Sequence, residues 1–251
     1  MKTNPQLKTL LFGIITSFTF FVKAQVLPSE FYDFQFKLNY LEKKEKFKLL
    51  KKTIKENPNE PLYYVMLADY YASERDMKNV IKYYEKSIEL DSKFAAGHSG
   101  LARYLCENDS TQLENALTHI NQAISLEYRG WNFHAIRANI YFRMKEYDLA
   151  LKDAYWELNI LGDIAYSAIE VIVRSLYAQK KDTELTAFLK KIDASKGIYG
   201  TEFTFFLGSL YENIKDFKKA CLCYHTAAES YVIIKEKIPS NIELKLKKCK
   251  Q

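Results

Sequence analysis

Similar residues recur along this chain at a fixed spacing of 70 positions. The four series are Tyr71, Tyr141 and Tyr211; Ala68, Ala138 and Gly208; Met77, Tyr147 and Phe217; and Val80, Ala150 and Ala220. Intermediate copies lie halfway, because Ala102 follows Ala68 by 34 residues and Tyr177 precedes Tyr211 by 34. A constant period of this length predicts stacked repeats, each of which packs against its neighbours along the chain.

Within a repeat, apolar and small residues fall three or four positions apart, which indicates helices. In residues 61–94 the first half carries Leu67, Ala68 and Tyr71, and the second half carries Val80 and Tyr84. Each half is too short to be stable as an isolated helix. We therefore expect two antiparallel helices per repeat that pack together and against the next pair.

These blocks resemble the tetratricopeptide repeat (TPR), whose 34-residue pattern has an aromatic residue, Leu-Gly and Tyr, followed by Ala, an aromatic residue and Pro. The resemblance implies an all-α fold, an α-solenoid of about five stacked antiparallel helix pairs. The repeats are expected at residues 61–94, 95–130, 131–164, 167–200 and 201–234. Residues 25–60 would form N-terminal helices of a partial repeat, and residues 235–251 a short capping helix and tail.

The fourth repeat matches this pattern least well. Tyr177 occupies its expected position, but Thr186 and Lys190 stand where alanine and an aromatic residue belong. We interpret residues 167–200 as a degenerate repeat.

The N-terminus has the features of a secretory signal peptide. Lys2 and Lys8 precede an apolar run over residues 9–22, which is shorter than the roughly 18 to 25 residues that cross a membrane. Small residues at Val22 and Ala24 suit signal-peptidase cleavage. We expect residues 1–24 to be removed between Ala24 and Gln25, so that the protein is periplasmic or secreted and not cytoplasmic. The alternative is an uncleaved anchor, which would be the chain's only association with a membrane.

Charge does not indicate nucleic-acid binding. The formal net charge of +6 includes Lys2, Lys8 and Lys23, and subtracting these three leaves +3 for the mature chain. The lysine-rich stretches at residues 42–56 and 235–250 are interleaved with glutamate or apolar residues, which is typical of solvated helix faces.

The four cysteines leave two interpretations open. Cys221 and Cys223 are poorly placed to pair with each other, because residues two apart point to different sides of a helix. Cys223 could pair with Cys249 if the tail folds back, since an exported protein can keep disulfides. The alternative, which we favour, is that all of them, with Cys106, stay reduced. Their spacing is not that of a zinc site.

No catalytic motif is present. The chain has no G-x-S-x-G, phosphate-binding loop or H-E-x-x-H sequence. His98 and His134 occupy the aromatic position of their helices, where they are expected to pack. The sequence therefore predicts a protein that is not an enzyme and that has no cofactor and no metal.

One charged pair is expected inside a repeat. Arg137 stands where leucine is usual, on the face where the two helices of the third repeat meet, and Asp153 lies opposite it on the second helix. We expect an ion pair that fixes this helical hairpin.

The resemblance also implies a binding face. In TPR proteins the second, fifth, ninth, twelfth and thirteenth positions of each first helix line a concave surface that holds ligands. The partner-binding candidates carried over to this chain are Asp69, Arg103, Asn139, Phe142, Arg143, Phe205, Ser209 and Glu212, with Ser175 and Gln179 from the fourth repeat. Val65 and Asp69 stand where some TPR proteins use lysine and asparagine to hold a peptide's terminal carboxylate, so that contact is not expected.

The function expected from these features is a noncatalytic scaffold or adaptor in an exported bacterial-type protein, which binds a peptide segment or a partner protein. One alternative is a glycan-binding or small-ligand-binding protein, and another is an accessory subunit of an envelope enzyme complex. Arg103, Asn139 and Arg143, with Phe142 beside them, are the expected centre of the binding face, because arginine and aromatic residues are frequent interface anchors.

Overall fold

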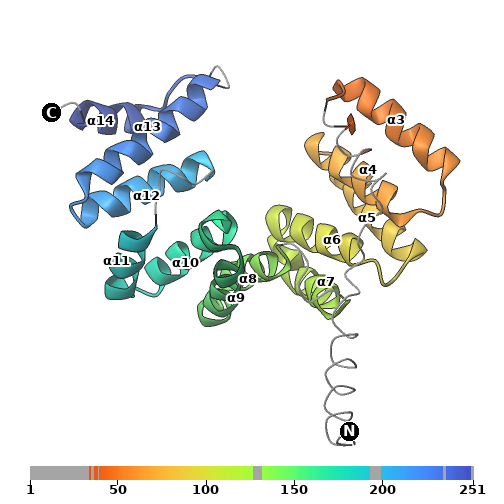
Figure 1. The fold of residues 1–251 in the computed structure, drawn as a ribbon, viewed down its shortest axis with the longest axis horizontal. Coiled ribbons are helices and arrows are strands. Elements are labelled where there is room, and N and C mark those ends of the chain that lie inside the picture. The colour runs from red at the N-terminus through yellow and green to blue at the C-terminus, as the bar shows by residue number, and fades with distance from the viewer. Residues whose placement is uncertain are drawn as a thin grey trace, which may run out of the picture. The chain divides into compact units, whose positions relative to one another are not determined.

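The structure is a computed structural model that describes residues 34, 37–38, 40–126, 132–192, 199–233 and 236–249. These residues form α-helices and two short 3-10 helices, and no β-strand occurs among them (Figure 1). The all-α prediction is therefore confirmed. The expected signal peptide and its cleavage point between Ala24 and Gln25 lie outside the described residues.

The described α-helices are α3 Lys43–Glu56, α4 Pro61–Ser73, α5 Met77–Leu90, α6 Ala95–Asn108, α7 Leu113–Leu126, α8 Phe133–Arg143, α9 Tyr147–Leu161, α10 Tyr166–Ala178, α11 Asp182–Lys191, α12 Thr201–Asn213, α13 Phe217–Ile233 and α14 Ser240–Lys248. The 3-10 helices are η1 Ser110–Gln112 and η2 Gly162–Ile164. The chain divides into two compact units: an N-terminal unit of residues 1–100 and 123–131, and a C-terminal unit of residues 101–122 and 132–251.

In the N-terminal unit, α4 and α5 pack as an antiparallel hairpin, and α3 packs against α4 (Figure 1). Leu67, Ala68 and Val80 are fully buried between α4 and α5. The ring of Phe47 in α3 stacks on Tyr70 at 5.2 Å between centroids. Helix α3 therefore completes the apolar contacts of the first hairpin.

In the C-terminal unit, α8 packs with α9, α10 with α11, α12 with α13, and α14 against α13. Small residues allow close approach within these pairs. A Cβ atom on Gly208 of α12 would lie 2.6 Å from Cε1 of Tyr224 and 3.1 Å from Cβ of Cys223 in α13. Those contacts are closer than real Cβ atoms tolerate, so the bulk of Tyr224 explains why glycine stands in this small-residue position.

The turn between the two helices of a repeat marks the repeat's register. Arg75, Lys145 and Lys215 each follow a first helix and have positive φ angles of 58°, 66° and 62°. They are 70 residues apart. The corresponding residue of the fourth repeat is Lys180, with φ 56°, and it lies 35 residues before Lys215.

The fourth repeat therefore begins one residue earlier than expected, at Tyr166, and the prediction that it is degenerate is wrong. With this register Val173, Leu176, Leu185 and Leu189 fill the core positions, and all four are buried. Tyr177 is 52% exposed and is not a core residue. Burial of the leucine face decides the register, and the tyrosine at a spacing of 34 was misleading.

The cysteine prediction is also corrected. Cys221 and Cys249 form a disulfide with a Cα–Cα distance of 5.5 Å, while Cys106 and Cys223 are free and buried. The tail does fold back, but its partner is Cys221 and not Cys223. Cys223 points into the contact between α12 and α13 beside Gly208, so only Cys221 is left on the side of α13 that faces α14.

Candidate partner-binding face

The residues at ligand-facing positions of α6, α8, α10 and α12 lie in the C-terminal unit, and we call them the first-helix face. With the corrected register its members are Arg103, Asn139, Phe142, Arg143, Glu170, Arg174, Tyr177, Phe205, Ser209 and Glu212. Asp69, the remaining candidate, lies in the N-terminal unit, where it accepts a hydrogen bond of 2.5 Å from the hydroxyl of Tyr84. Asp69 therefore contributes to the first hairpin itself.

In α6 and α8, the predicted central residues have different roles. Arg143 Nη1 donates a hydrogen bond to the backbone carbonyl of Cys106, so this arginine links α8 to α6. Phe142 packs against the core, with its ring 5.8 Å from that of Tyr147. Arg103 is exposed and Asn139 half-buried. Arg143 thus has a structural contact, whereas Arg103 presents its side chain at the surface.

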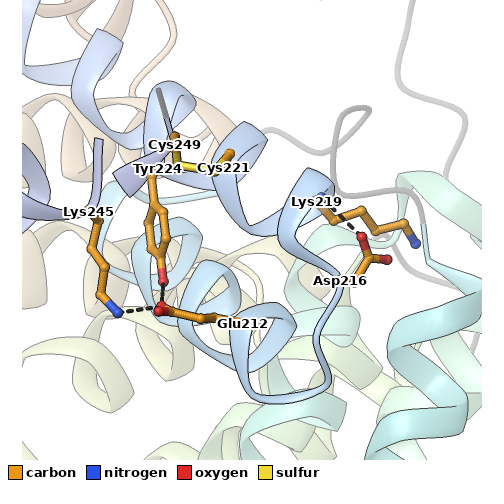
Figure 2. The surroundings of a disulfide bond; sticks show 7 residues. All are labelled: Glu212, Asp216, Lys219, Cys221, Tyr224, Lys245 and Cys249. Carbon is orange, nitrogen blue, oxygen red and sulfur yellow. Dashed lines mark hydrogen bonds and ion pairs between the residues drawn. A yellow bond between two sulfur atoms is a disulfide. The ribbon is translucent and has the colours of Figure 1, made fainter. Parts of the chain in front are cut away.

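In the fifth repeat, the capping helix α14 occupies part of the face. Glu212 of α12 accepts a hydrogen bond of 2.7 Å from the Tyr224 hydroxyl and forms an ion pair with Lys245 of α14 (Figure 2). The Lys245 hydrogen bond, followed by that of Tyr224, lowers the pKa of Glu212. Ile242 of α14 is buried against Ala227 and Ala228. Glu212, a predicted binding residue, is therefore engaged by the cap.

The other two candidates of this repeat make local contacts. The Phe205 ring lies 5.5 Å from that of Tyr224. Ser209 Oγ donates a hydrogen bond of 2.6 Å to the carbonyl of Phe206, one turn back in the same helix. Both side chains are half-buried.

The wrong register had concealed the residues that α10 contributes to the face. Ser175, chosen from the expected phase, is fully buried, and Gln179 donates a hydrogen bond of 2.8 Å to Asp148. The corrected phase places Glu170, Arg174 and Tyr177 on the face instead. The signal available in the sequence was the buried stripe Val173, Leu176, Leu185 and Leu189.

Arg174 is held in place by three side chains. Its Nε donates a hydrogen bond of 2.8 Å to Glu170 Oε1. Its guanidinium carbon lies 5.2 Å from the ring centroid of Phe203 and 5.5 Å from that of Phe206. These are cation–π distances, which stabilise an arginine in one orientation. The Arg174 side chain is still 33% exposed.

A cavity of about 320 Å³ opens beside Tyr177. Its apolar wall is formed by Tyr177, Leu185, Leu189, Leu210 and Ile214, and its polar wall by Asp182, Thr186 and Asn213. The ring of Tyr177 also meets Phe206 edge-on at 5.2 Å, so it separates the cavity from the aromatic support of Arg174.

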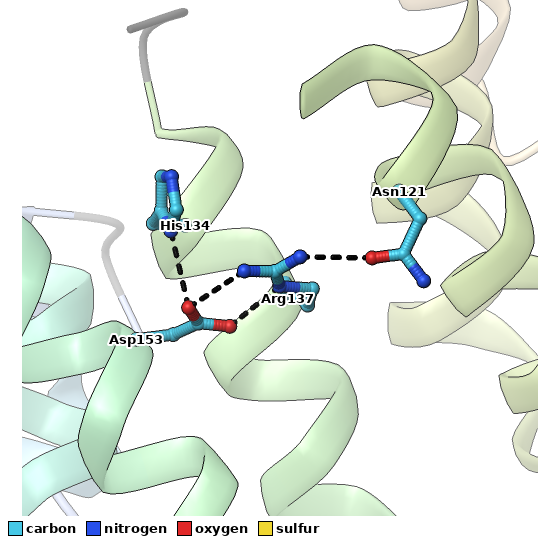
Figure 3. A network of polar contacts seen from close by, with 4 residues as sticks. All are labelled: Asn121, His134, Arg137 and Asp153. Carbon is cyan, nitrogen blue, oxygen red and sulfur yellow. Dashed lines mark hydrogen bonds and ion pairs between the residues drawn. The ribbon is translucent and has the colours of Figure 1, made fainter. Parts of the chain in front are cut away.

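A second polar cluster lies inside the third repeat. Arg137 donates two hydrogen bonds to Asp153, of 2.6 Å from Nε and 2.9 Å from Nη2 (Figure 3). Its Nη1 donates to Asn121 Oδ1 of α7 at 2.9 Å, and His134 Nδ1 lies 3.1 Å from Asp153 Oδ1. The expected ion pair forms, and Arg137 also connects α8 to α7.

Two buried carboxylates near this cluster titrate in opposite directions. Burial raises the pKa of Asp153, but hydrogen bonds from Arg137 and His134 outweigh it, and the pKa is lowered overall. Burial dominates at Glu157, whose pKa is raised although the backbone N–H groups of Ala135 and Asn132 donate to it. Glu157 thereby satisfies donors at the beginning of α8, which have no partner within that helix.

Among the described residues, no group of three or more His, Cys, Asp or Glu side chains is arranged to hold a metal ion. The helices of the same part of the chain do not combine the length and the apolar character that crossing a membrane requires.

Comparison with known proteins agrees with this architecture. Residues 62–94 match the sequence profile of the tetratricopeptide repeat. Comparison of the sequence with curated proteins finds no match.

Solved structures with a similar fold are TPR proteins or pilus factors of low sequence identity. PilW, a type IV pilus biogenesis factor, has a TM-score of 0.65 and 9% identity over 83% of this chain and 91% of its own. A TPR protein from Parabacteroides merdae has a TM-score of 0.60 and 11% identity, covering 86% of this chain and 79% of its own.

YrrB, described as a TPR protein with an unusual peptide-binding site, has a TM-score of 0.50 and 16% identity, covering 72% of this chain and 91% of its own. At these identities the likeness concerns the fold. The chain contains a tetratricopeptide repeat at residues 62–94 and has the α-solenoid fold of TPR proteins.

Proposed function

We propose that this protein is a noncatalytic scaffold that binds a segment of a partner protein on the first-helix face of its C-terminal unit. The observation that carries the proposal is the fixed, partly exposed Arg174 on aromatic rings beside a cavity of about 320 Å³. Arginine and aromatic side chains held rigid at a surface are frequent anchors of protein interfaces. YrrB provides a parallel, as a protein of similar fold with a peptide-binding site.

A noncatalytic role is supported by the way the buried polar groups are used. His134 and Asp153 are in contact, as in many acid–base pairs, but both are buried and Asp153 accepts two hydrogen bonds from Arg137. This arrangement holds a hairpin together and leaves the carboxylate little freedom to act on a substrate.

The proposal includes export to the periplasm or the exterior. Its support is the signal-peptide pattern of residues 1–24 together with the Cys221–Cys249 disulfide. Structural disulfides persist in oxidising compartments and are rare in the bacterial cytoplasm.

Export predicts that the chain, expressed in a bacterium with its own N-terminus, is recovered outside the cytoplasm and begins at Gln25. Cell fractionation and N-terminal sequencing test this. Ala24→Asp should block cleavage, because signal peptidase requires a small residue at that position. Wild-type protein that stays in the cytoplasm with residues 1–24 intact would contradict export.

The scaffold function predicts that the full chain, carrying a C-terminal tag, retains a partner protein when it is purified from envelope extracts. Arg103→Ala should reduce the amount captured about fivefold, as expected for an interface arginine worth about 1 kcal/mol. Arg103→Ala/Arg143→Ala should reduce it further, with a melting curve as a check because Arg143 also binds the Cys106 carbonyl.

Lys152→Ala is the matched control, because Lys152 is an exposed cation on the second helix α9. Quantitative mass spectrometry of the captured protein provides the comparison. A partner captured equally by all variants would remove these arginines from the binding face, and a wild-type chain that retains no partner would contradict the scaffold function.

A further inference from the structure

Arg174 presents an unfilled set of hydrogen-bond donors. Its Nε is taken by Glu170, and no described residue accepts a hydrogen bond from Nη1 or Nη2. Contact with Phe203 and Phe206 fixes the plane of the guanidinium before any ligand arrives. A planar guanidinium fits a carboxylate through two parallel hydrogen bonds, and a fixed one loses little side-chain entropy when it binds.

The cavity beside Tyr177 suits a different group. Five of its eight lining residues are apolar or aromatic, and the only charge on its wall is the carboxylate of Asp182. A ligand carboxylate placed there would be repelled by Asp182, whereas a large apolar side chain would bury surface against Leu185, Leu189 and the neighbouring residues. At about 320 Å³ the cavity is comparable with the smallest ligand pockets. It therefore fits one side chain better than a complete small molecule.

The spacing of the two subsites defines the ligand further. Arg174 and Tyr177 are three residues apart on one helix, so their Cβ atoms are about 5 to 6 Å apart. An extended peptide advances about 3.3 Å per residue, and its side chains point to the same side every second residue, about 6.6 Å apart. An acidic residue on Arg174 and an apolar residue in the cavity are thus two positions apart.

We infer that α10 and α12 form a recognition site for an extended peptide segment that carries an acidic residue and a large apolar residue two positions from it. The acidic side chain binds the Nη1 and Nη2 groups of Arg174, and the apolar side chain enters the cavity next to Tyr177. This inference rests on the proposed function and names the chemistry of the segment that is bound.

Labelled peptides capped at both ends test the inference directly. The probe has Glu-Ala-Phe between Gly-Ser flanks, and its binding to the full chain is followed by fluorescence anisotropy. Replacing Glu by Gln in the probe should weaken binding about tenfold, the loss expected for a charge-assisted hydrogen-bonded pair. Replacing Phe by Ala should weaken it by a similar factor, and raising the salt concentration should weaken the Glu probe more than the Gln probe.

Two variants of the protein should shift the affinity in opposite directions. Arg174→Gln should weaken binding of the Glu probe about tenfold and remove the preference for Glu over Gln. Glu170→Gln should strengthen binding several-fold, because it removes the carboxylate that competes for the guanidinium. A purely structural role of the pair would make both variants bind more weakly. Lys152→Gln, which removes one positive charge from α9, should leave the affinity unchanged.

The outcomes separate this inference from the scaffold function. Equal binding of the Glu and Gln probes, or binding that Glu170→Gln weakens, overturns the inference even if Arg174→Gln does not fold. If wild-type protein captures a partner but binds none of the probes, the recognition site is wrong and the scaffold function stands. If it also captures no partner, the scaffold function is wrong as well.

Discussion

Replacing Asp153 by alanine should lower the free energy of unfolding by about 3 to 5 kcal/mol, as expected when one member of a buried ion pair is removed. Asp153 is only 5% exposed, and its loss would leave Arg137 and His134 without their shared acceptor between α8 and α9. Urea unfolding at neutral pH, followed by circular dichroism, measures the change. Unchanged stability together with lost partner capture would instead place the pair in the binding site.

The pH dependence of this variant provides an internal check. Because the folded-state pKa of Asp153 is lowered, its stabilisation is fully present above the ordinary aspartate pKa of about 3.9 and is lost as the pH falls through the folded value. The difference between wild type and Asp153→Ala should therefore shrink in acid.

Glu157→Gln is the matched control. The pKa of Glu157 is raised by burial, so its charge costs stability at neutral pH, and removing that charge should leave stability at pH 7 equal to or above that of wild type. A loss as large as that of Asp153→Ala would show that burial alone, and not the ion pair, explains the effect.

Breaking the Cys221–Cys249 disulfide should release α14. The bond joins residues 28 positions apart, and closing a loop of that length contributes about 3 to 4 kcal/mol in the chain-entropy model. Cys221→Ser/Cys249→Ser, or reduction of the wild type, should raise hydrogen exchange over residues 240–249 while α8 to α11 stay protected. Unchanged exchange in the reduced protein would show that Ile242 and Lys245 hold the cap without the disulfide.

The two free cysteines permit a clean version of that experiment. Burial raises the pKa of Cys223 to about 12 and that of Cys106 to about 11, although Lys219 and Arg143 respectively act in the opposite direction. The thiolate is the form that attacks a disulfide, so neither thiol should exchange with the disulfide near neutral pH. Cys106→Ser then serves as a control that removes a thiol without touching the cap.

The helical hairpins could be predicted from the sequence because their packing depends on local periodicity. Ala68, Ala138 and Gly208 recur at 70 residues, and each is buried within its hairpin. The subdivision of that period could not be read from one anchor residue. The first and second repeats take 34 and 36 residues, whereas the left-handed turns at Lys145, Lys180 and Lys215 show 35 and 35 for the third and fourth.

The candidate site was less accessible to sequence reasoning, for a related reason. A helix position that is wrong by one residue is rotated by about 100°, so Ser175 was placed on the surface although it is buried, and Arg174 was overlooked. Contacts between distant elements, such as Lys245 with Glu212 or Arg143 with the Cys106 carbonyl, depend on tertiary packing and leave no local pattern. The disulfide partner of Cys249 belongs to the same class.

The covalent attachment of α14 also sets a boundary for any long ligand. Because Lys245 already occupies Glu212, a polypeptide lying along α12 reaches an obstacle at that end and has to stop there or turn outward. Growth of the contact is then possible only in the opposite direction, toward α8 and α6. The oxidised tail in this way gives an otherwise repetitive surface a defined terminus.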